Sequence, residues 1–186
     1  KKLDPVFDYA VEVDITDING ETRSAASVIP VGYKSLVLDI KLPAAVLQTD
    51  SLKNIFVGSS NLSGEPEPVA TTVTIFPLKA PNRLIRKKYW DAPDQFIYSE
   101  AEYVKFFPHD EYKDESDYHN WPRANSIYST ADTSNRKFQI ANTKLTPGWY
   151  AIEATAKDKD GNNIKAVEYV QLYDAAAKTI PLPLYN

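Results

Sequence analysis

The segment YAIEATAKDKDG occupies residues 150–161, and YAVEVDITDING at residues 9–20 repeats its pattern near the other end of the chain. Extended to Ala25 and Ala166, the two copies share six residues without a gap. In each copy apolar residues occupy every second position, which is typical of a strand with one buried face. Each copy then reaches Asn-Gly or Asp-Gly, which favour the positive φ angles of tight hairpin turns. The sequence therefore predicts two long β-hairpins, each closing one of two similar domains.

The composition places the chain among globular proteins, since 43% of its 186 residues are hydrophobic and 25% are charged. The absence of cysteine excludes disulfides, thiolate metal sites and a cysteine nucleophile. The net charge of −4 is spread without a basic stripe, so we expect no nucleic acid partner. Within this segment no apolar run approaches about 18 residues and none has the pattern of a signal peptide, so we expect no direct membrane insertion of this segment.

Between Ser35 and Tyr173, short segments of strand-like composition alternate with turn signals. The seven predicted strands are about 36–42, 53–59, 69–78, 125–131, 136–141, 149–158 and 163–173. Seven short strands joined by turns indicate an all-β fold, namely a seven-stranded antiparallel β-sandwich of the immunoglobulin or fibronectin-like type.

The same segments divide the chain into three predicted parts. Residues 1–34 form the closing hairpin of a preceding, similar domain. Residues 35–174 form the sandwich, with an insertion at 80–124, and residues 175–186 are a linker or entry strand to a following domain. Two strands alone are marginally stable in water. We therefore expect residues 1–34 either to dock on the sandwich or to pair with another molecule.

The insertion interrupts the strand pattern with prolines, both histidines and a dense set of aromatic residues. Within it, SEAEYVKFF (residues 99–107) predicts a short helix, because Ser99 and Glu102 have the spacing of a capping box and Pro108 ends the segment. Tyrosine and tryptophan are enriched at recognition surfaces. The candidates for an interaction surface are Tyr89, Trp90, Tyr112, Tyr118 and Trp121. The competing interpretation is that the aromatic residues build a small core of the insertion against the sandwich.

No segment has the residue pattern of a catalytic or metal site. DKDGNN (residues 158–163) lacks the ligands that an EF-hand-like calcium loop needs, so it predicts a hairpin turn. His109, Asp110, Glu111 and His119 fit no recognised metal-ligand spacing, and we interpret them as a solvated polar loop. No serine lies in a G-x-S-x-G segment, and no nucleophile–base pair is evident. We therefore expect no enzymatic activity, no cofactor and no bound metal.

The second copy resembles the closing hairpin of a macroglobulin domain, since Gly148-Trp149-Tyr150 leads into the alternating strand and KDKDG turns into a return strand. The first copy, which ends in DITDINGETRSAASV, looks like the same hairpin of a preceding macroglobulin domain. Such domains are stacked in series in alpha-2-macroglobulin-like proteins, including the bacterial ones. The insertion, with YWDAPDQF, FPHDEY and Trp121, is similar to that of the Bacteroidetes branch of this family.

The resemblance implies a non-catalytic structural domain of a large protease-trapping inhibitor. It implies a location outside the cytoplasm, in the periplasm or at the cell surface. In that location, a region that precedes this segment could carry a lipid anchor. The implied partners are neighbouring macroglobulin domains of the same polypeptide and, through the full-length protein, target proteases. In this family, cleavage of a bait segment triggers collapse around the protease, and thioester-bearing members use a C-x-E-Q motif.

This cysteine-free chain cannot hold the thioester motif, and no functional residue of the family carries over to it. The rival hypothesis comes from a different class of protein. It is a cell-surface carbohydrate-binding or adhesive sandwich module that uses the aromatic insertion as its platform. Loss of polysaccharide binding on Trp90→Ala or Trp121→Ala would favour that hypothesis.

Overall fold

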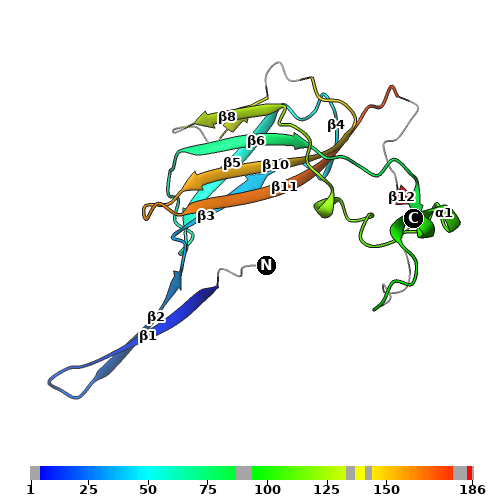
Figure 1. Cartoon of the computed structure of the whole chain (residues 1–186). Coiled ribbons are helices and arrows are strands. Elements are labelled where there is room, and N and C mark those ends of the chain that lie inside the picture. The colour runs from blue at the N-terminus through cyan, green and yellow to red at the C-terminus, as the bar shows by residue number, and fades with distance from the viewer. Residues whose placement is uncertain (1–4, 87–93, 133–136, 141–143, 178–183, 186) are drawn as a thin grey trace.

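The computed structural model describes residues 5–86, 94–132, 137–140, 144–177 and 184–185. Its centre is an all-β sandwich of two sheets, which confirms the fold class expected from the sequence (Figure 1). A two-stranded hairpin projects from one end of the sandwich, and the insertion lies beyond the other end, beside the C-terminus. No helix in the described part of the chain has the length and apolarity to cross a membrane.

Two sheets of unequal size form the sandwich. The larger sheet has the strand order β4 (Val46–Gln48), β11 (Asn163–Tyr173), β10 (Gly148–Lys157), β6 (Thr71–Pro77) and β8 (Tyr128–Asp132). The smaller sheet has the order β3 (Leu36–Lys41), β5 (Asn54–Asn61) and β9 (Lys137–Gln139). The seven strands expected from the sequence are all present, as β3, β5, β6, β8, β9, β10 and β11.

The sandwich also contains a strand that the sequence did not predict, β4, which pairs in parallel with β11. The Gln171 N–H donates to the Ala45 carbonyl at 2.8 Å, and the Thr49 N–H donates to the Tyr173 carbonyl at 2.9 Å. A strand of three residues is too short to show a periodicity, so its pairing depends on β11 being in place. The larger sheet is therefore mixed at this edge, while the seven predicted strands pair antiparallel with one another as expected.

The core lies between the two sheets and consists of side chains at alternate strand positions. On β3 and β10 the residues that the alternation of the sequence predicted to be buried are all buried, and on β10 Ala151 of the opposite face is buried as well. The predicted residues are Leu36, Leu38, Ile40, Tyr150, Ile152, Ala154 and Ala156. Burial of each larger aliphatic side chain contributes about 1.5–3 kcal/mol, so this interface is the main source of the sandwich's stability.

A buried tyrosine fixes the corner at which the chain enters β10. The Tyr150 hydroxyl donates to the Thr146 carbonyl at 2.7 Å and accepts from the Thr146 N–H at 3.1 Å. A tyrosine near the start of a strand that bonds back to the backbone a few residues upstream is the tyrosine corner of immunoglobulin-like sandwiches. This corner and the arrangement of three strands against five support the immunoglobulin-like character of the fold.

The first predicted hairpin consists of β1 (Val6–Thr16) and β2 (Thr22–Gly32), which pair along their whole length. Every residue of β1 is exposed, and the hairpin extends away from the sandwich (Figure 1). The expectation that this segment docks on the sandwich is therefore wrong for its described residues. The physical reason is that the inner faces of the two sheets already cover each other and leave no core face for a third layer. Pairing with another molecule stays a prediction.

The insertion joins β6 to β8 and contains little regular structure. Its elements are β7 (Ile85–Arg86), α1 (Glu100–Phe106) and η1, a turn of 3-10 helix (Tyr118–Asn120). The helix predicted from the capping box is confirmed, because the Ser99 hydroxyl accepts from the Glu102 N–H and the Glu102 carboxylate accepts from the Ser99 N–H. After the sandwich, β12 (Leu184–Tyr185) returns to the insertion and pairs in parallel with β7.

Candidate interaction surfaces

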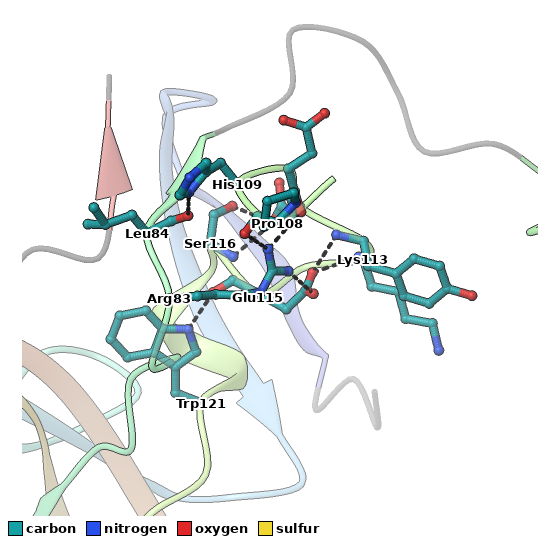
Figure 2. Close-up of polar contacts among 11 residues, drawn as sticks. Arg83, Leu84, Pro108, His109, Lys113, Glu115, Ser116 and Trp121 are labelled. Atoms are coloured by element: carbon teal, nitrogen blue, oxygen red, sulfur yellow. Dashed lines mark hydrogen bonds and ion pairs between the residues drawn. The ribbon is translucent and has the colours of Figure 1, made fainter. Parts of the chain in front are cut away.

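The guanidinium of Arg83 organises the loop that follows α1 (Figure 2). Its Nη1 donates to the carbonyls of Pro108 at 3.0 Å and Asp110 at 2.9 Å, and its Nη2 donates to Glu115 Oε1 at 2.9 Å. The side chains of Arg83 and Glu115 are each roughly one-fifth exposed, so water screens this ion pair only in part. The rigid fork of an arginine suits three acceptors at fixed positions. Arg83 therefore holds the loop in one conformation.

Glu115 extends this network to the tryptophan at the end of the insertion. Its Oε2 accepts from the backbone N–H groups of Tyr112 at 2.9 Å and Lys113 at 2.7 Å. Its backbone carbonyl accepts from the indole Nε1–H of Trp121 at 2.7 Å, as Figure 2 shows. The polar atom of a buried indole is thus satisfied, which allows the rest of the ring to pack away from water.

Stacked rings attach the second half of the insertion to the outer face of the larger sheet. Tyr118 stacks on Trp149 of β10 with ring centroids 4.2 Å apart, and it meets Tyr169 of β11 edge to face at 5.4 Å. Trp121 contacts Trp149 edge to face at 6.1 Å. Such aromatic pairs contribute about 0.5–1.5 kcal/mol each beyond the area that they bury. The insertion is therefore a fixed part of the domain at this point.

An ion-pair cluster lies on the same face of the sheet. The Glu153 carboxylate of β10 pairs with Arg123, which follows η1, and with Lys165 of β11. Burial raises the pKa of Glu153, but hydrogen bonds from Lys165 and Arg123 outweigh burial and hold the pKa below its ordinary range. The Arg123 guanidinium also lies 5.2 Å from the centre of the Phe76 ring. A charge-assisted pair on a half-covered surface therefore reinforces the attachment of the insertion.

The structure separates the aromatic residues that the sequence singled out. Tyr112 and Trp121 are buried, at 7% and 6% exposure, and Tyr118 is half-buried between its stacking partners. Tyr89 and Trp90 lie outside the described residues. The described candidates therefore act as the insertion's own packing, and neither Tyr112 nor Trp121 offers a ring face on which a sugar can stack.

Two partners in this packing, Trp149 and Tyr169, were not among the candidates. Both point outward from strands whose inner face forms the core, so they sit opposite the predicted buried positions. An aromatic residue at an outward strand position is the signal that could have identified them, because such a position normally faces water.

An exposed apolar surface lies at the far side of the insertion, around α1. None of the residues of α1 is buried. The exposed apolar side chains there are Phe96, Ile97, Tyr98, Phe106 and Phe107. Exposed apolar patches of this kind mark contact sites on soluble domains.

The histidines have separate surroundings. His109 Nδ1 lies 3.1 Å from the Leu84 carbonyl, beside β7, whereas His119 pairs with Asp117 and meets Tyr169 edge to face. Among the described residues, no group of three histidine, cysteine or acidic side chains is placed to hold a metal ion. The geometry therefore points to roles for both histidines in local packing and hydrogen bonding.

The projecting hairpin reproduces the backbone hydrogen bonds and the Oδ1 hydrogen bonds of the turn in the β10–β11 hairpin. Asp158 Oδ1 accepts from the N–H groups of Asp160 at 3.0 Å and Asn162 at 2.8 Å, which confirms the predicted turn. In the first hairpin, Asp17 Oδ1 accepts from the N–H groups of the residues at the same spacing, at 2.8 Å and 2.9 Å. The glycine that follows each aspartate has φ of +84° at Gly20 and +83° at Gly161. The two turns have one geometry.

The Asp158 carboxylate has a further partner that links the turn to the start of the sandwich. Its Oδ2 accepts from the N–H of Ser35, the residue before β3, at 3.3 Å, and from Asn162 Nδ2 at 3.0 Å. Burial raises the pKa of Asp158, but the hydrogen bonds from Asn162, Ser35 and Asp160 outweigh burial and lower the pKa below its ordinary value. The closing turn is thereby fastened to the strand that opens the domain.

One face of the projecting hairpin is apolar over most of its length, and its polar residues are Ser27 and Arg23. It carries Phe7, Tyr9, Val11, Val13, Ile15, Ile29 and Val31. The opposite face carries the acidic and hydroxyl side chains of Asp8, Glu12, Asp14, Thr16, Thr22 and Ser24, together with the exposed apolar residues Val6 and Val28. A strand pair with one apolar face is expected to lie on an apolar core, and here that face is exposed.

Comparisons of the chain with protein-family models, with curated proteins and with solved structures give no significant match.

Proposed function

We propose that this chain is a non-catalytic structural segment of an alpha-2-macroglobulin-like, multidomain protease-trapping protein that acts outside the cytoplasm. The observation that carries the proposal is the repeated closing hairpin. β1–β2 has the turn and the register of β10–β11, yet it exposes the face that β10–β11 buries in a sandwich core. Such a hairpin is expected where similar sandwiches follow one another, as the resemblance to macroglobulin domains implies.

The insertion has a structural role within this proposal. Its second half is attached to the outer face of the larger sheet through Tyr118 and Trp149, and β12 returns to it from the end of the sandwich. The exposed apolar side chains around α1 provide a surface for contact with a neighbouring domain of the same polypeptide. The domain would then contact its neighbours through the β1–β2 hairpin at one end and through the α1 region at the other. Such a chain of connected domains suits a protein that encloses its target.

The test begins with the polypeptide as its source cells make it. An antibody raised against this chain detects that polypeptide, and its mass is compared with the 20.9 kDa of the segment. We expect a product several times larger. When the purified product is mixed with a protease, we expect cleavage of large protein substrates to fall while cleavage of small peptides continues, because enclosure excludes substrates by size. A native product close to 20.9 kDa, or equal cleavage of both substrate classes, contradicts the proposal.

A further inference from the structure

We propose that the apolar face of the β1–β2 hairpin docks on the inner face of a three-stranded sheet that belongs to a second, differently packed sandwich. We also propose that the Asp17 carboxylate accepts a backbone N–H from the segment that enters that sheet. The inference rests on the proposed function, because it names the partner of the hairpin within a multidomain chain.

The two hairpins have the same register. Val13 lies opposite Ala25 in the first hairpin, and Ala154 lies opposite Ala166 in the second, at the same distance from the turn. Each residue of the apolar face therefore has a counterpart on β10 or β11 whose surroundings are known. Tyr9 corresponds to Tyr150.

Corresponding residues of the two hairpins differ in burial. Tyr150, Ile152, Ala154 and Ala156 are at most 8% exposed, because they face β3 and β5 of the smaller sheet. The corresponding residues of β1 are between 42% and 67% exposed; they are Tyr9, Val11, Val13 and Ile15. The apolar face of β1–β2 has the same pattern and register as the buried face of β10–β11. We therefore expect an apolar sheet to cover it in the same way.

A second copy of this chain does not offer the sheet face that the hairpin needs. In every copy the inner face of β3–β5–β9 is already covered by β10 and β11. The volumes also differ, since Val13 and Ile15 take the positions of Ala154 and Ala156. Extra methyl groups in a packed core force neighbouring side chains out of their rotamers, so the partner sheet needs smaller residues opposite these two.

The polar end of the face is compatible with this docking. Arg23 takes the position of Ile164, opposite Ile15 and next to the turn. At the rim of an interface an arginine can cover apolar surface with its stem while the guanidinium remains in water. The residue therefore marks where the covered surface ends.

The role of Asp17 follows from its counterpart. Asp158 uses Oδ1 for its own turn, and its Oδ2 accepts from Asn162 Nδ2 and from the N–H of Ser35, which enters the first strand of the same sandwich. Asp17 uses Oδ1 for its own turn in the same way, and it is exposed among the described residues. Its Oδ2 is therefore placed to accept the equivalent N–H of the sandwich that the first hairpin closes.

Thiol labelling tests the docking, because the chain contains no cysteine of its own. The Val11→Cys variant reports on the apolar face, and the matched Glu12→Cys variant reports on the opposite face of the same strand. In the isolated chain we expect both thiols to react at similar rates. In the polypeptide purified from its source cells, we expect the Val11→Cys thiol to react at least about tenfold more slowly and the Glu12→Cys thiol to stay reactive. A factor of ten corresponds to about 1.4 kcal/mol of opening free energy.

The contrary outcomes are distinct from a failure of the proposed function. Rapid labelling of the Val11→Cys variant in a native polypeptide of high mass overturns the docking and leaves the multidomain proposal standing. Equal protection of both variants overturns the one-sided docking. Protection of the Val11→Cys variant that appears in the isolated chain and grows with concentration overturns the proposal in favour of a second copy.

The Asp17→Asn variant tests the hydrogen bond to the entering segment. Asparagine keeps an oxygen for the turn and replaces the second oxygen by an N–H₂ group, which cannot accept. In the native polypeptide carrying Val11→Cys, we expect this change to speed labelling by several fold, whereas the isolated chain is unaffected. An unchanged labelling rate in the native polypeptide overturns the assignment of Asp17.

Discussion

The ring of Tyr118 lies on the indole of Trp149 with centroids 4.2 Å apart and planes 19° from parallel. One residue belongs to the insertion and the other to an outward position of β10, so this stack joins the two parts of the domain. Further ring contacts with Tyr169 and Trp121 surround it. The insertion is thus fixed at its second half, while the α1 region presents exposed apolar side chains.

Replacement of Trp149 should weaken this attachment. We expect Trp149→Ala to lower the free energy of unfolding by about 2–3 kcal/mol, less than the ~3–5 kcal/mol of a fully buried aromatic residue, because Trp149 is half-buried. Denaturant unfolding measures the loss. The control is Trp149→Phe, which keeps a ring and removes an indole N–H that is buried without a partner among the described residues. A loss of the same size in both variants contradicts a role for the stack.

The tyrosine corner makes a prediction about the sandwich itself. We expect Tyr150→Phe to lower the free energy of unfolding by about 1–2 kcal/mol, because the Thr146 carbonyl loses a buried hydrogen bond of 2.7 Å. Tyr173→Phe is the matched control, since that side chain is exposed, and it should change stability by less than about 0.5 kcal/mol. Thermal or urea unfolding compares the two. If Tyr150→Phe is as stable as the parent chain, the tyrosine corner does not stabilise the sandwich and the prediction is wrong.

Arg83 should matter more than its neighbour Arg86. We expect Arg83→Ala to destabilise the loop around Pro108 and Glu115 by about 2 kcal/mol, because three hydrogen bonds to one guanidinium are lost together. Hydrogen exchange of the Tyr112 amide measures the local opening. Arg86→Ala breaks a pair with Asp110 in which the arginine is largely exposed, so its effect should stay below about 1 kcal/mol. Equal exchange in the two variants is the contrary result.

Because the two turns have the same geometry, a glycine-to-alanine substitution can be compared at Gly20 and at Gly161. A β-carbon at Gly161 or Gly20 meets no atom within 4 Å, so alanine is strained only by the positive φ angle at each position. We expect Gly161→Ala to cost the sandwich about 1–2 kcal/mol, since this turn closes it. Gly20→Ala should leave the unfolding of the sandwich unchanged, because β1–β2 contributes nothing to its core. Calorimetry of both variants checks this, and equal shifts in Tm contradict it.

Acid should destabilise the sandwich through Asp158. Its folded-state pKa is lowered below the ordinary 3.8, so the unfolded chain binds the proton more tightly than the folded one. The contribution to stability is complete above that ordinary value and is lost as the pH falls through the folded-state pKa. Unfolding measured from about pH 6 to about pH 2 should show a loss of stability at the acid end that Asp158→Asn reduces. An identical acid profile in that variant contradicts the assignment.

Several features of the fold could be predicted from short segments of the sequence. The alternation at Tyr150, Ile152 and Ala154 predicted the buried face of β10, because a strand's side chains point to its two faces in turn. The spacing of Ser99 and Glu102 predicted the start of α1, because both hydrogen bonds of the capping box form within one turn. These interactions join residues that are close in the chain.

The placement of the candidate site could be predicted only in part. The insertion's aromatic residues were evident from their density, but their roles depend on partners elsewhere in the chain. Trp121 is buried because its indole reaches the Glu115 carbonyl and its ring meets Trp149. The segment alone gives no indication that an outward position of β10 completes that packing.

The amino-acid sequence by itself therefore determined seven strands of the sandwich, the two matching hairpins and the capped helix, since each depends on local hydrogen bonding and on a period of two or a short spacing. Only the tertiary structure decided that β4 joins β11, that Tyr118 stacks on Trp149 and that the apolar face of β1 is exposed. The physical reason is that a strand face becomes buried only when a second surface covers it. Tyr9 and Tyr150 occupy the same place in the same pattern, and a sheet that covers one of them leaves the other in water.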